Sequence, residues 1–325
     1  MRTEHFYFLS SEGSKQIHGM RWIPDGEVRG VVQLVHGMSE YIARYSAFAE
    51  YLTEQGFAVT GHDHLGHGDS AAPAPRKASF NGLTQPAASP EYGFFAEKNG
   101  NRALVCDMHH VYCLMKKKYD GVPYYILGHS MGSFLTRQYI CCYGNGVDGA
   151  ILCGTGYHAE PEIKLALALC QVGGKLFGWH HHSRLFEWMT SGIYNKQFAP
   201  NRTSADWLSR NEANVDAYLA DSRCGFSFTF NGYYTLMLTL YKINRMEYLR
   251  RMPRDLPVLF VSGAEDPVGA SGKGVHRVEE QFREIGMRDV SCILYPGDRH
   301  ELLNETDKEK AWKDIVEWIR ERSFA

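Results

Sequence analysis

The sequence predicts an α/β fold, with a mostly parallel central sheet, helices on both faces and an inserted helical cap. Two observations carry this prediction. Short apolar strands alternate with helical segments along most of the 325 residues, and repeated strand–helix units form parallel sheets covered by helices. Between about residues 156 and 233 this alternation stops, and the chain is helical and rich in apolar and aromatic side chains. We therefore expect a core formed by residues 1–155 and 234–325, and a cap formed by residues 156–233.

The core elements can be placed from the spacing of their apolar residues. Gly30–Val35 is almost entirely apolar, which is typical of a strand buried on both faces of a sheet. Two antiparallel strands joined by a turn at residues 13–14 precede it. Residues 71–92 are rich in Ala, Pro and Ser without periodicity, which predicts a surface loop. Strands are expected at 5–9, 18–23, 30–35, 57–60, 123–127, 149–153, 258–262 and 291–295, and helices at 44–55, 102–118, 131–143, 275–286 and 307–322, with a further helix ending at 251.

Composition and charge exclude several classes of function. A net charge of −2 and a pI near 6.7 leave no basic field that could hold nucleic acid or an anionic membrane. No apolar run is long enough to span a bilayer, and the first residues lack the profile of a secretory signal. The eight cysteines have no Cys-x-x-Cys spacing, so we interpret them as reduced thiols of a cytoplasmic protein. No coiled-coil heptads occur, and the sequence defines no oligomeric state.

A serine between two glycines lies at the junction of a predicted strand and a predicted helix. The segment is Gly128-His129-Ser130-Met131-Gly132. In this setting Gly-x-Ser-x-Gly is the nucleophile elbow, which exposes a serine hydroxyl on a sharp turn. Because the pattern is short, an ordinary glycine-rich turn is the alternative. The elbow is favoured if a base, an acid and oxyanion donors occur elsewhere in the chain.

Two later strands end in residues that could activate this serine. A serine hydroxyl needs a neighbouring base, and the base needs a partner that orients it. The strand at 258–262 leads to Asp266 and the strand at 291–295 leads to His300, in the order expected for this architecture. We assign Ser130 as nucleophile, His300 as general base and then acid, and Asp266 as the group that orients His300.

Two other carboxylates are alternatives for the acid. Glu265 directly precedes Asp266, and Asp298 lies only two residues before His300. Pro267 restricts Asp266 to an extended backbone, which suits a turn at a strand end. Asp298 is the weaker alternative because it lies so close to His300 in sequence.

An oxyanion hole requires two backbone N–H groups that point at the tetrahedral oxygen. One is expected from Met131, the residue after the nucleophile, and the other from the loop that follows the strand at 30–35. Met38 is the expected second donor, because Gly37 lets this loop approach the site closely.

Five segments taken in order carry a resemblance to a known family. They resemble the monoacylglycerol lipase/lysophospholipase group of α/β-hydrolases over nearly the whole chain. The resemblance implies an α/β-hydrolase fold with a helical cap, no cofactor, and hydrolysis of carboxylic esters of glycerol, lysophospholipids or small alcohols. The loop at 71–92 is longer than the usual pattern, and the cap matches only loosely. The five segments are His36-Gly37-Met38-Ser39-Glu40-Tyr41, residues 61–70, residues 128–132, residues 262–268 and residues 299–305.

The resemblance leaves the substrate open. In such enzymes the cap determines the substrate, so we expect the substrate contacts within residues 156–233. The apolar cap side chains suit an acyl-chain pocket or transient contact with lipid aggregates, although they could equally pack the cap onto the core. A peptidase or amidase on the same fold, or a non-catalytic binder of a hydrophobic ligand, are the alternative functions. No partner other than a lipid or small-molecule ester is expected.

Two histidine-rich segments suggest a metal as a further alternative. Residues 62–69 contain three histidines and two aspartates, which can hold zinc. The helical i, i+4 spacing is missing, however, and Gly66 and Gly68 indicate a tight turn. His180-His181-His182 is interpreted as a solvated turn in the cap. We therefore expect no metal at either segment.

Overall fold

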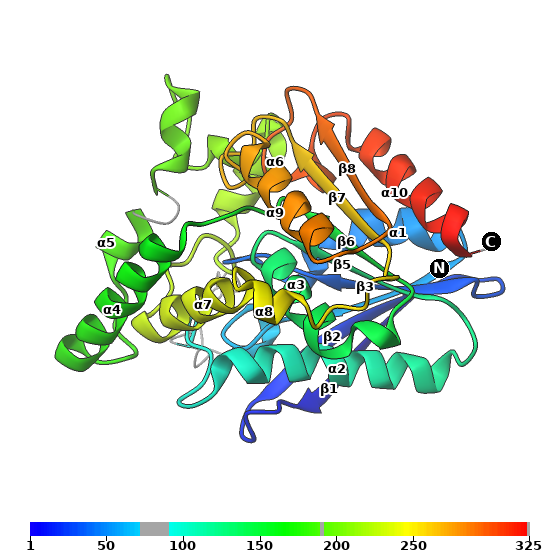
Figure 1. Cartoon of the computed structure of the whole chain (residues 1–325), viewed down its shortest axis with the longest axis horizontal. Helices are drawn as coiled ribbons and strands as arrows, with labels where there is room; N and C mark the ends of the chain where they lie inside the picture. The colour runs from blue at the N-terminus through cyan, green and yellow to red at the C-terminus, as the bar shows by residue number, and fades with distance from the viewer. Residues whose placement is uncertain (72–90, 189–191, 324–325) are drawn as a thin grey trace, which may run out of the picture.

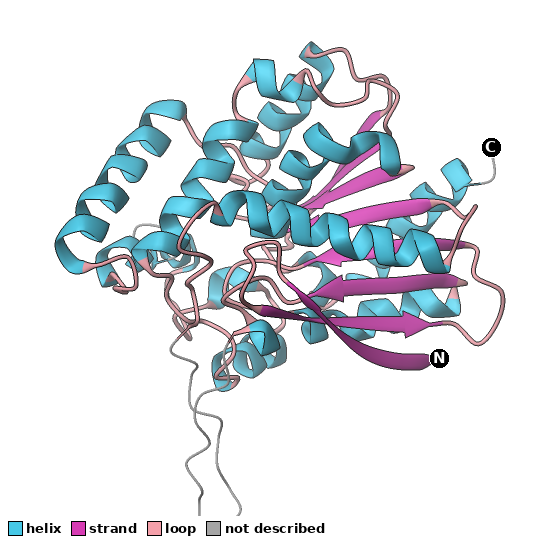
Figure 2. Ribbon diagram, turned by 90° about the horizontal axis from the view of Figure 1, so that it is seen from below, coloured by secondary structure: helices cyan, strands magenta, loops and turns pink. Residues whose placement is uncertain are grey.

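The computed structural model describes residues 1–71, 91–188 and 192–323. The loop predicted over residues 71–92 lies almost entirely outside this range. The described residues form one sheet of eight strands with helices on both sides, and a group of helices extends from one end of the sheet (Figures 1 and 2). The predicted fold class is confirmed.

The sheet has the strand order β1-β2-β4-β3-β5-β6-β7-β8. The β1–β2 and β2–β4 pairs are antiparallel, and all later neighbours are parallel. The carboxyl ends of β5, β7 and β8 therefore face the same edge of the sheet, where the predicted site residues follow. The strands are β1 Arg2–Leu9, β2 Gln16–Ile23, β3 Gly30–Val35, β4 Phe57–His62, β5 Tyr124–His129, β6 Gly149–Cys153, β7 Val258–Gly263 and β8 Val290–Tyr295.

Each central strand supplies side chains to two separate cores, because successive residues of a strand point to opposite faces. In β5, Tyr124 and Ile126 join the core beneath α2, α3 and α9, whereas Tyr125 and Leu127 join the core beneath α1 and α10. Burial on both faces explains why these strands are apolar runs rather than alternating patterns. The helices are α1 Ser46–Glu54, α2 Gly100–Lys118, α3 Met131–Tyr143, α9 Lys273–Glu284 and α10 Lys308–Ser323.

The helical insertion lies between β6 and β7 and includes the predicted cap. Its longest helices, α4 and α7, pack against each other, and α7 also packs on α3 and α2. The predicted boundary at residue 233 falls inside α7. The helix predicted to reach Arg251 instead stops at Ile243, since Arg245 takes an extended conformation (φ −86°, ψ 120°) before α8. The elements are α4 Glu160–Phe177, α5 Arg184–Glu187, η5 Tyr194–Phe198, η6 Asp206–Leu208, α6 Glu212–Ala220, α7 Phe230–Ile243 and α8 Met246–Leu249.

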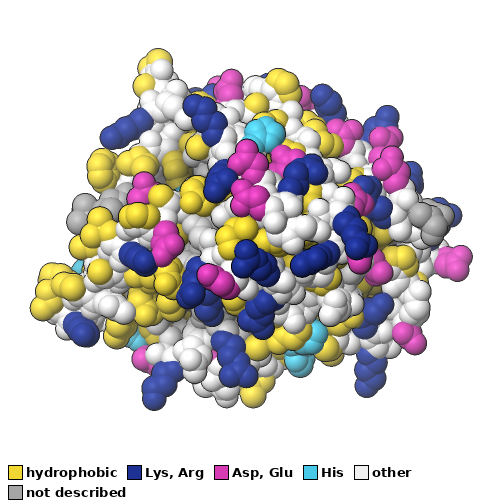
Figure 3. Space-filling view, in the orientation of Figure 1, with side chains coloured by type: hydrophobic (Ala, Val, Ile, Leu, Met, Phe, Trp, Pro, Cys, Tyr) yellow, Lys and Arg dark blue, Asp and Glu magenta, His cyan; other side chains and the backbone are white. Residues whose placement is uncertain are grey.

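Helix α4 has two apolar faces. Ile163 and Cys170 are buried, and Gly173 lets α4 approach Phe230 of α7 so closely that an added β-carbon would lie 2.3 Å from its ring. A second stripe faces outward, at the end of the molecule away from α10, where hydrophobic side chains gather (Figure 3). Its members are Leu165, Leu169, Val172 and Leu176, exposed by 39% to 71%. None of the described helices combines the length and apolar character needed to cross a bilayer.

Candidate active site

Ser130 occupies the sharp turn between β5 and α3. Its backbone has φ 53° and ψ −121°, a conformation that is unfavourable for any residue other than glycine. The turn brings segments of backbone very close together. A β-carbon at Gly128 would lie 2.3 Å from the Gly132 carbonyl oxygen, and one at Gly132 would lie 2.0 Å from the Val35 carbonyl oxygen. The strand–turn–helix arrangement predicted for the elbow is therefore present, and both glycines are required by it.

His300 and Asp266 follow β8 and β7 and meet in the interior. The Nδ1–H of His300 donates to both carboxylate oxygens of Asp266 at 2.9 Å, and both side chains are buried. Asp266 is held in turn by the backbone N–H of Val268 at 2.9 Å and the Ser262 hydroxyl at 3.3 Å. Because Nδ1 carries the proton, Nε2 of His300 is the nitrogen that can accept one.

The structure distinguishes between the candidate acids. Glu265 is exposed, and Asp298 pairs with Arg210 of the cap. Asp266 is the carboxylate that reaches His300. Ser130 and His300 line the same cavity, so the structure brings the predicted nucleophile, base and acid together.

The two predicted oxyanion donors line the same cavity as Ser130. Met131 is the first residue of α3, and Met38 lies in the loop after β3; both line the cavity. The loop is so close that a β-carbon at Gly37 would lie 3.1 Å from the Ser130 β-carbon and 2.6 Å from the Glu40 carboxylate. Gly37 thus permits the approach that the sequence predicted.

A buried carboxylate, Glu40, holds this loop in place, and the sequence did not reveal its role. Glu40 accepts hydrogen bonds from the Gly37 N–H at 2.6 Å and the Tyr45 hydroxyl at 2.8 Å. It also accepts from Arg44 at 2.8 Å and from His129 Nδ1 at 3.2 Å. Burial alone would raise the pKa of Glu40, but the bonds and charges of His129 and Arg44 hold that pKa well below its usual range. Glu40 is therefore ionised, and it accepts hydrogen bonds from four separate donors.

His129 joins Glu40 to the base. Its Nε2 donates to the backbone carbonyl of His300 at 3.1 Å, while Nδ1 faces Glu40. Burial lowers the pKa of His129, but the hydrogen bond and charge of Glu40 outweigh it and raise that pKa. A protonated His129 donates from both nitrogens. The residue before the nucleophile thereby connects the oxyanion loop to the base loop.

A second buried carboxylate fastens the base loop to the cap. Glu301 accepts two hydrogen bonds of 2.7 Å from the Arg44 guanidinium, a bidentate pair, and one of 2.6 Å from Asn214 in α6. Arg44 therefore lies between Glu40 and Glu301 and neutralises part of their charge. The residue after the predicted base is tied to both core and cap.

The cavity above Ser130 has a volume of about 930 Å³ and is lined by both core and cap. Most of its lining is apolar or aromatic, and it includes four carboxylates but no Lys or Arg among the described residues. The carboxylates are Glu40, Glu162, Glu187 and Glu301. An apolar volume of this size suits a drug-sized or lipid-like ligand.

The histidine-rich turn at residues 62–69 stabilises the loop that follows β3. Asp63 accepts from His18, from the Ile42 N–H and from the Asp69 N–H at 2.8 to 2.9 Å. His67 Nε2 accepts from the Ser39 N–H at 3.2 Å. Burial lowers the pKa of His62 and His67 to about 3, so both are neutral rings. Although His18, Asp63 and Asp69 lie within 4.8 Å of one another, Asp63 is already bonded on both oxygens.

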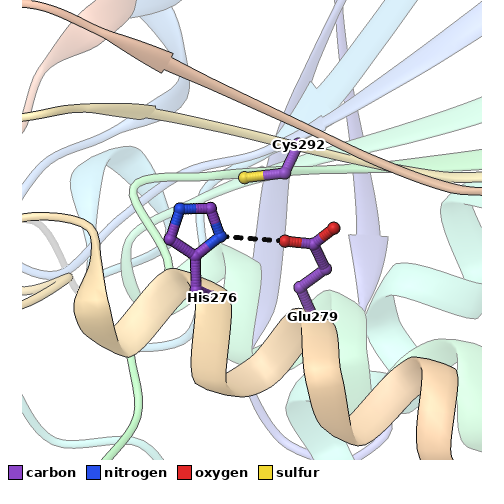
Figure 4. A group of neighbouring side chains, drawn as sticks. All are labelled: His276, Glu279 and Cys292. Carbon is purple, nitrogen blue, oxygen red and sulfur yellow. Dashed lines mark hydrogen bonds and ion pairs between the residues drawn. The ribbon is translucent and has the colours of Figure 1, made fainter.

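A second group of possible metal ligands lies on the surface, between α9 and β8. His276 and Glu279 point from α9 toward Cys292 of β8, and none of the three lines the cavity (Figure 4). Glu279 accepts from His276 at 3.0 Å and from Arg283 at 2.8 Å. These i, i+3 and i, i+4 pairs are ordinary for an exposed helix, and Arg283 places a cation beside the carboxylate.

His180, His181 and His182 are exposed, as predicted for a solvated turn. His180 stacks on Phe94 with ring centroids 3.8 Å apart, and His182 Nδ1 donates to the Ser227 carbonyl at 2.9 Å. These contacts join the turn to neighbouring loops.

Comparison with known proteins agrees with this geometry. Residues 26–307 match the serine aminopeptidase S33 family. The chain belongs to this family. Proteins similar to it include a monoacylglycerol lipase of Mycolicibacterium smegmatis, 27% identical over 98% of this chain and 97% of its own, and a monoglyceride lipase of Mus musculus, 26% identical over 94% and 86%. A thermostable carboxyl esterase from Bacillus coagulans, solved with glycerol, superposes with a TM-score of 0.88 at 26% identity over 99% of both chains. The expected resemblance to the monoacylglycerol lipase/lysophospholipase group of α/β-hydrolases is confirmed.

Proposed function

We propose that this S33 family member is a serine hydrolase that cleaves carboxylic esters, with neutral monoacylglycerols as its preferred substrates. The observation that carries the proposal is Ser130 on a strained elbow, beside the His300–Asp266 pair, under one largely apolar cavity. The similar proteins named as monoacylglycerol lipases and as a carboxyl esterase support the same reaction.

The reaction proceeds through an acyl-enzyme. Ser130 Oγ attacks the ester carbonyl while its proton passes to His300 Nε2. The amides of Met38 and Met131 hold the oxyanion, and Asp266 stabilises the imidazolium. His300 then protonates the departing alcohol, and water activated by the same histidine releases the fatty acid.

The charge of the cavity favours a neutral leaving group. Its lining holds four carboxylates and no Lys or Arg among the described residues, and the nearby Arg44 is already bonded to Glu40 and Glu301. A phosphate-bearing lysophospholipid would find no lysine or arginine partner among these residues, and the like charges of the carboxylates disfavour it. A glycerol ester carries no charge, so it avoids this cost.

The outward stripe of α4 suits transient contact with lipid aggregates. Its four exposed apolar side chains lie on the cap, the part of the chain that also lines the cavity. Burial of apolar surface is favourable by about 25 cal/mol per Å², and this free energy favours contact of the stripe with a lipid interface. We expect Leu176→Ser to reduce binding to phosphatidylcholine vesicles while turnover of a water-soluble ester is unchanged; equal vesicle binding would contradict this role.

The free cysteines fit a cytoplasmic site of action. All eight are free thiols, and burial raises the pKa of four that lie inside the protein. Buried, protonated thiols are inert packing groups in a reducing compartment. These four are Cys141, Cys153, Cys170 and Cys224.

An aminopeptidase is the second candidate. The family description supports it, and the acidic lining of the cavity could bind a protonated amine. Glu162 and Glu187 are the cap carboxylates that line the cavity. A p-nitroanilide of an amino acid is the corresponding test substrate.

One experiment tests the proposal against this alternative. Turnover is measured for p-nitrophenyl esters of rising acyl length, monoacylglycerol, a lysophospholipid and an aminoacyl p-nitroanilide. We expect monoacylglycerol to be preferred and Ser130→Ala to lower kcat by at least about a thousand-fold. Ser204→Ala is the matched control, because Ser204 is another serine that lines the cavity. Undiminished turnover in Ser130→Ala, or faster cleavage of the anilide, would overturn the proposal.

A further inference from the structure

A cap tryptophan lies over the predicted base. Trp207, in η6, packs on the ring of His300 with centroids 5.1 Å apart and planes at 33°. Tyr194, also from the cap, packs against Trp207 at 5.1 Å. Trp207 lines the cavity beside Ser130.

The flanking residues hold these two rings together. The residue before Trp207 accepts at its carbonyl from the Arg299 guanidinium at 2.6 Å, and the residue after it accepts from the Glu301 N–H at 2.6 Å. Arg299 and Glu301 are the two neighbours of His300. The neighbours of one ring are therefore bonded to the neighbours of the other, and the stack is fixed from both sides.

His300 becomes a cation when it takes the serine proton, and the charged groups around it differ in their effect. Asp266, after β7, accepts from its Nδ1 and favours the cation. His129, at the end of β5, has its ring 4.8 Å away and disfavours a second positive charge when protonated. The face of an indole within about 6 Å of a cation attracts it. Trp207 is the aromatic neighbour that can offset the charge of His129.

We propose that Trp207 stabilises the imidazolium of His300 and holds its ring in place, so that the cap supplies a positioning residue for the base. This inference rests on the proposed function, because it requires His300 to accept the proton of Ser130. The cap then acts on the chemical step as well as on substrate choice.

The test is the pH dependence of kcat/KM for a short, water-soluble p-nitrophenyl ester. Without the indole the imidazolium is less stable, so the acidic limb should move to lower pH. For Trp207→Leu we expect a shift of about 0.4 to 1.5 pH units and a fall in plateau kcat of up to about thirty-fold. Trp207→Phe, which keeps an aromatic ring, should show a smaller shift in the same direction.

Trp188→Leu is the matched control, since Trp188 is a second cap tryptophan that lines the cavity and pairs with Lys196 instead. It should change KM without moving the limb. An unmoved limb in Trp207→Leu, or in Trp207→Phe if the leucine variant fails to fold, overturns the inference. If Ser130→Ala is inactive and the acidic limb of Trp207→Leu does not move, only the role of Trp207 is rejected. If Ser130→Ala is active, the proposed function and this inference are both rejected.

Discussion

The nucleophile and the base of this site are held in different ways. Ser130 is fixed by backbone packing: a strand, a helix, and two glycines, of which Gly132 lies against the backbone at the end of β3. His300 is fixed by distant partners, including Asp266, His129 and the cap segment around Trp207. The position of the nucleophile is thus set by the packing of backbone segments, and that of the base by side chains from distant segments.

The largest effect is expected from disrupting the backbone packing that holds the nucleophile. In Gly132→Ala the new β-carbon would lie 2.0 Å from one backbone carbonyl oxygen and 2.7 Å from another, and neither can move aside. We expect a loss of at least about 3 kcal/mol in the free energy of unfolding, with activity lost, because overpacking against backbone forces the turn apart. Urea denaturation measures this change. Gly26→Ala is the control, since its β-carbon meets no atom within 4 Å, and equal stability of the two variants would contradict the close approach.

Removing the charge of Glu40 should weaken the contacts that hold the base. In Glu40→Gln, Arg44 and His129 lose the carboxylate that they share, so the base loop loses one of its anchors. We expect kcat/KM to fall by about a hundred-fold, because breaking a buried charged pair costs about 3 to 5 kcal/mol, of which only part reaches the transition state. Glu50→Gln, at an exposed position of α1, should leave kcat/KM unchanged. A Glu40→Gln enzyme with wild-type kcat/KM would show that the anchor is dispensable.

The buried histidines of the turn at residues 62–69 and His129 beside the base should respond to pH in opposite directions. The pKa of His62 and of His67 is about 3 in the folded protein, below the unfolded value of about 6.5, so the unfolded chain binds more protons in acid. Their contribution is complete above about pH 6.5 and declines as the pH falls, by about 2 kcal/mol for each histidine at pH 5. The raised pKa of His129 has the opposite sign: its contribution is complete below about pH 6.5 and is lost as the pH rises through the folded pKa.

Urea denaturation from pH 5 to pH 9 measures both limbs. His62→Phe should flatten the acidic limb, and Glu40→Gln should flatten the alkaline one. A stability that stays constant from pH 7 to pH 5 would contradict the neutral, buried state of His62 and His67.

The smallest effect is expected at Asn214 of the cap. Asn214→Ala removes the hydrogen bond of 2.6 Å to Glu301 and one of 3.3 Å that Asn214 accepts from Arg44, while Arg44 keeps its two bonds to Glu301. We expect a loss of about 1 kcal/mol in the free energy of unfolding and a change in kcat/KM of less than about three-fold. Glu212→Ala, on the exposed side of α6, is the control. A fall in kcat/KM as large as that of Glu40→Gln would mean that the cap holds the base loop more strongly than the core does.

The same contrast explains which features could be predicted from the sequence. The strands, the elbow and the order of Ser130, Asp266 and His300 follow from apolar runs and short motifs, which are local. β3, α3 and β6 have the predicted bounds. Asp266 could be placed because it follows a buried strand that ends at the same edge of the sheet as β5.

The sequence could not reveal the contacts between distant segments. Glu40 lies 89 residues from His129, and Arg44 lies 257 residues from Glu301, so no spacing connects them. Trp207 lies in a segment of short 3₁₀ turns without apolar periodicity. The break between α7 and α8 was missed because the apolar spacing continues across a single extended residue, Arg245.

The paired bonds around Trp207 and His300 have a consequence for engineering. Changing the specificity of such an enzyme by grafting a cap from a relative assumes that the cap is a separate module. Here residues 206–208 and 299–301 form one junction, with hydrogen bonds passing between them. A functional chimera must take both segments from the same parent, because a foreign cap would remove the residues that pack against His300 and hold it in position.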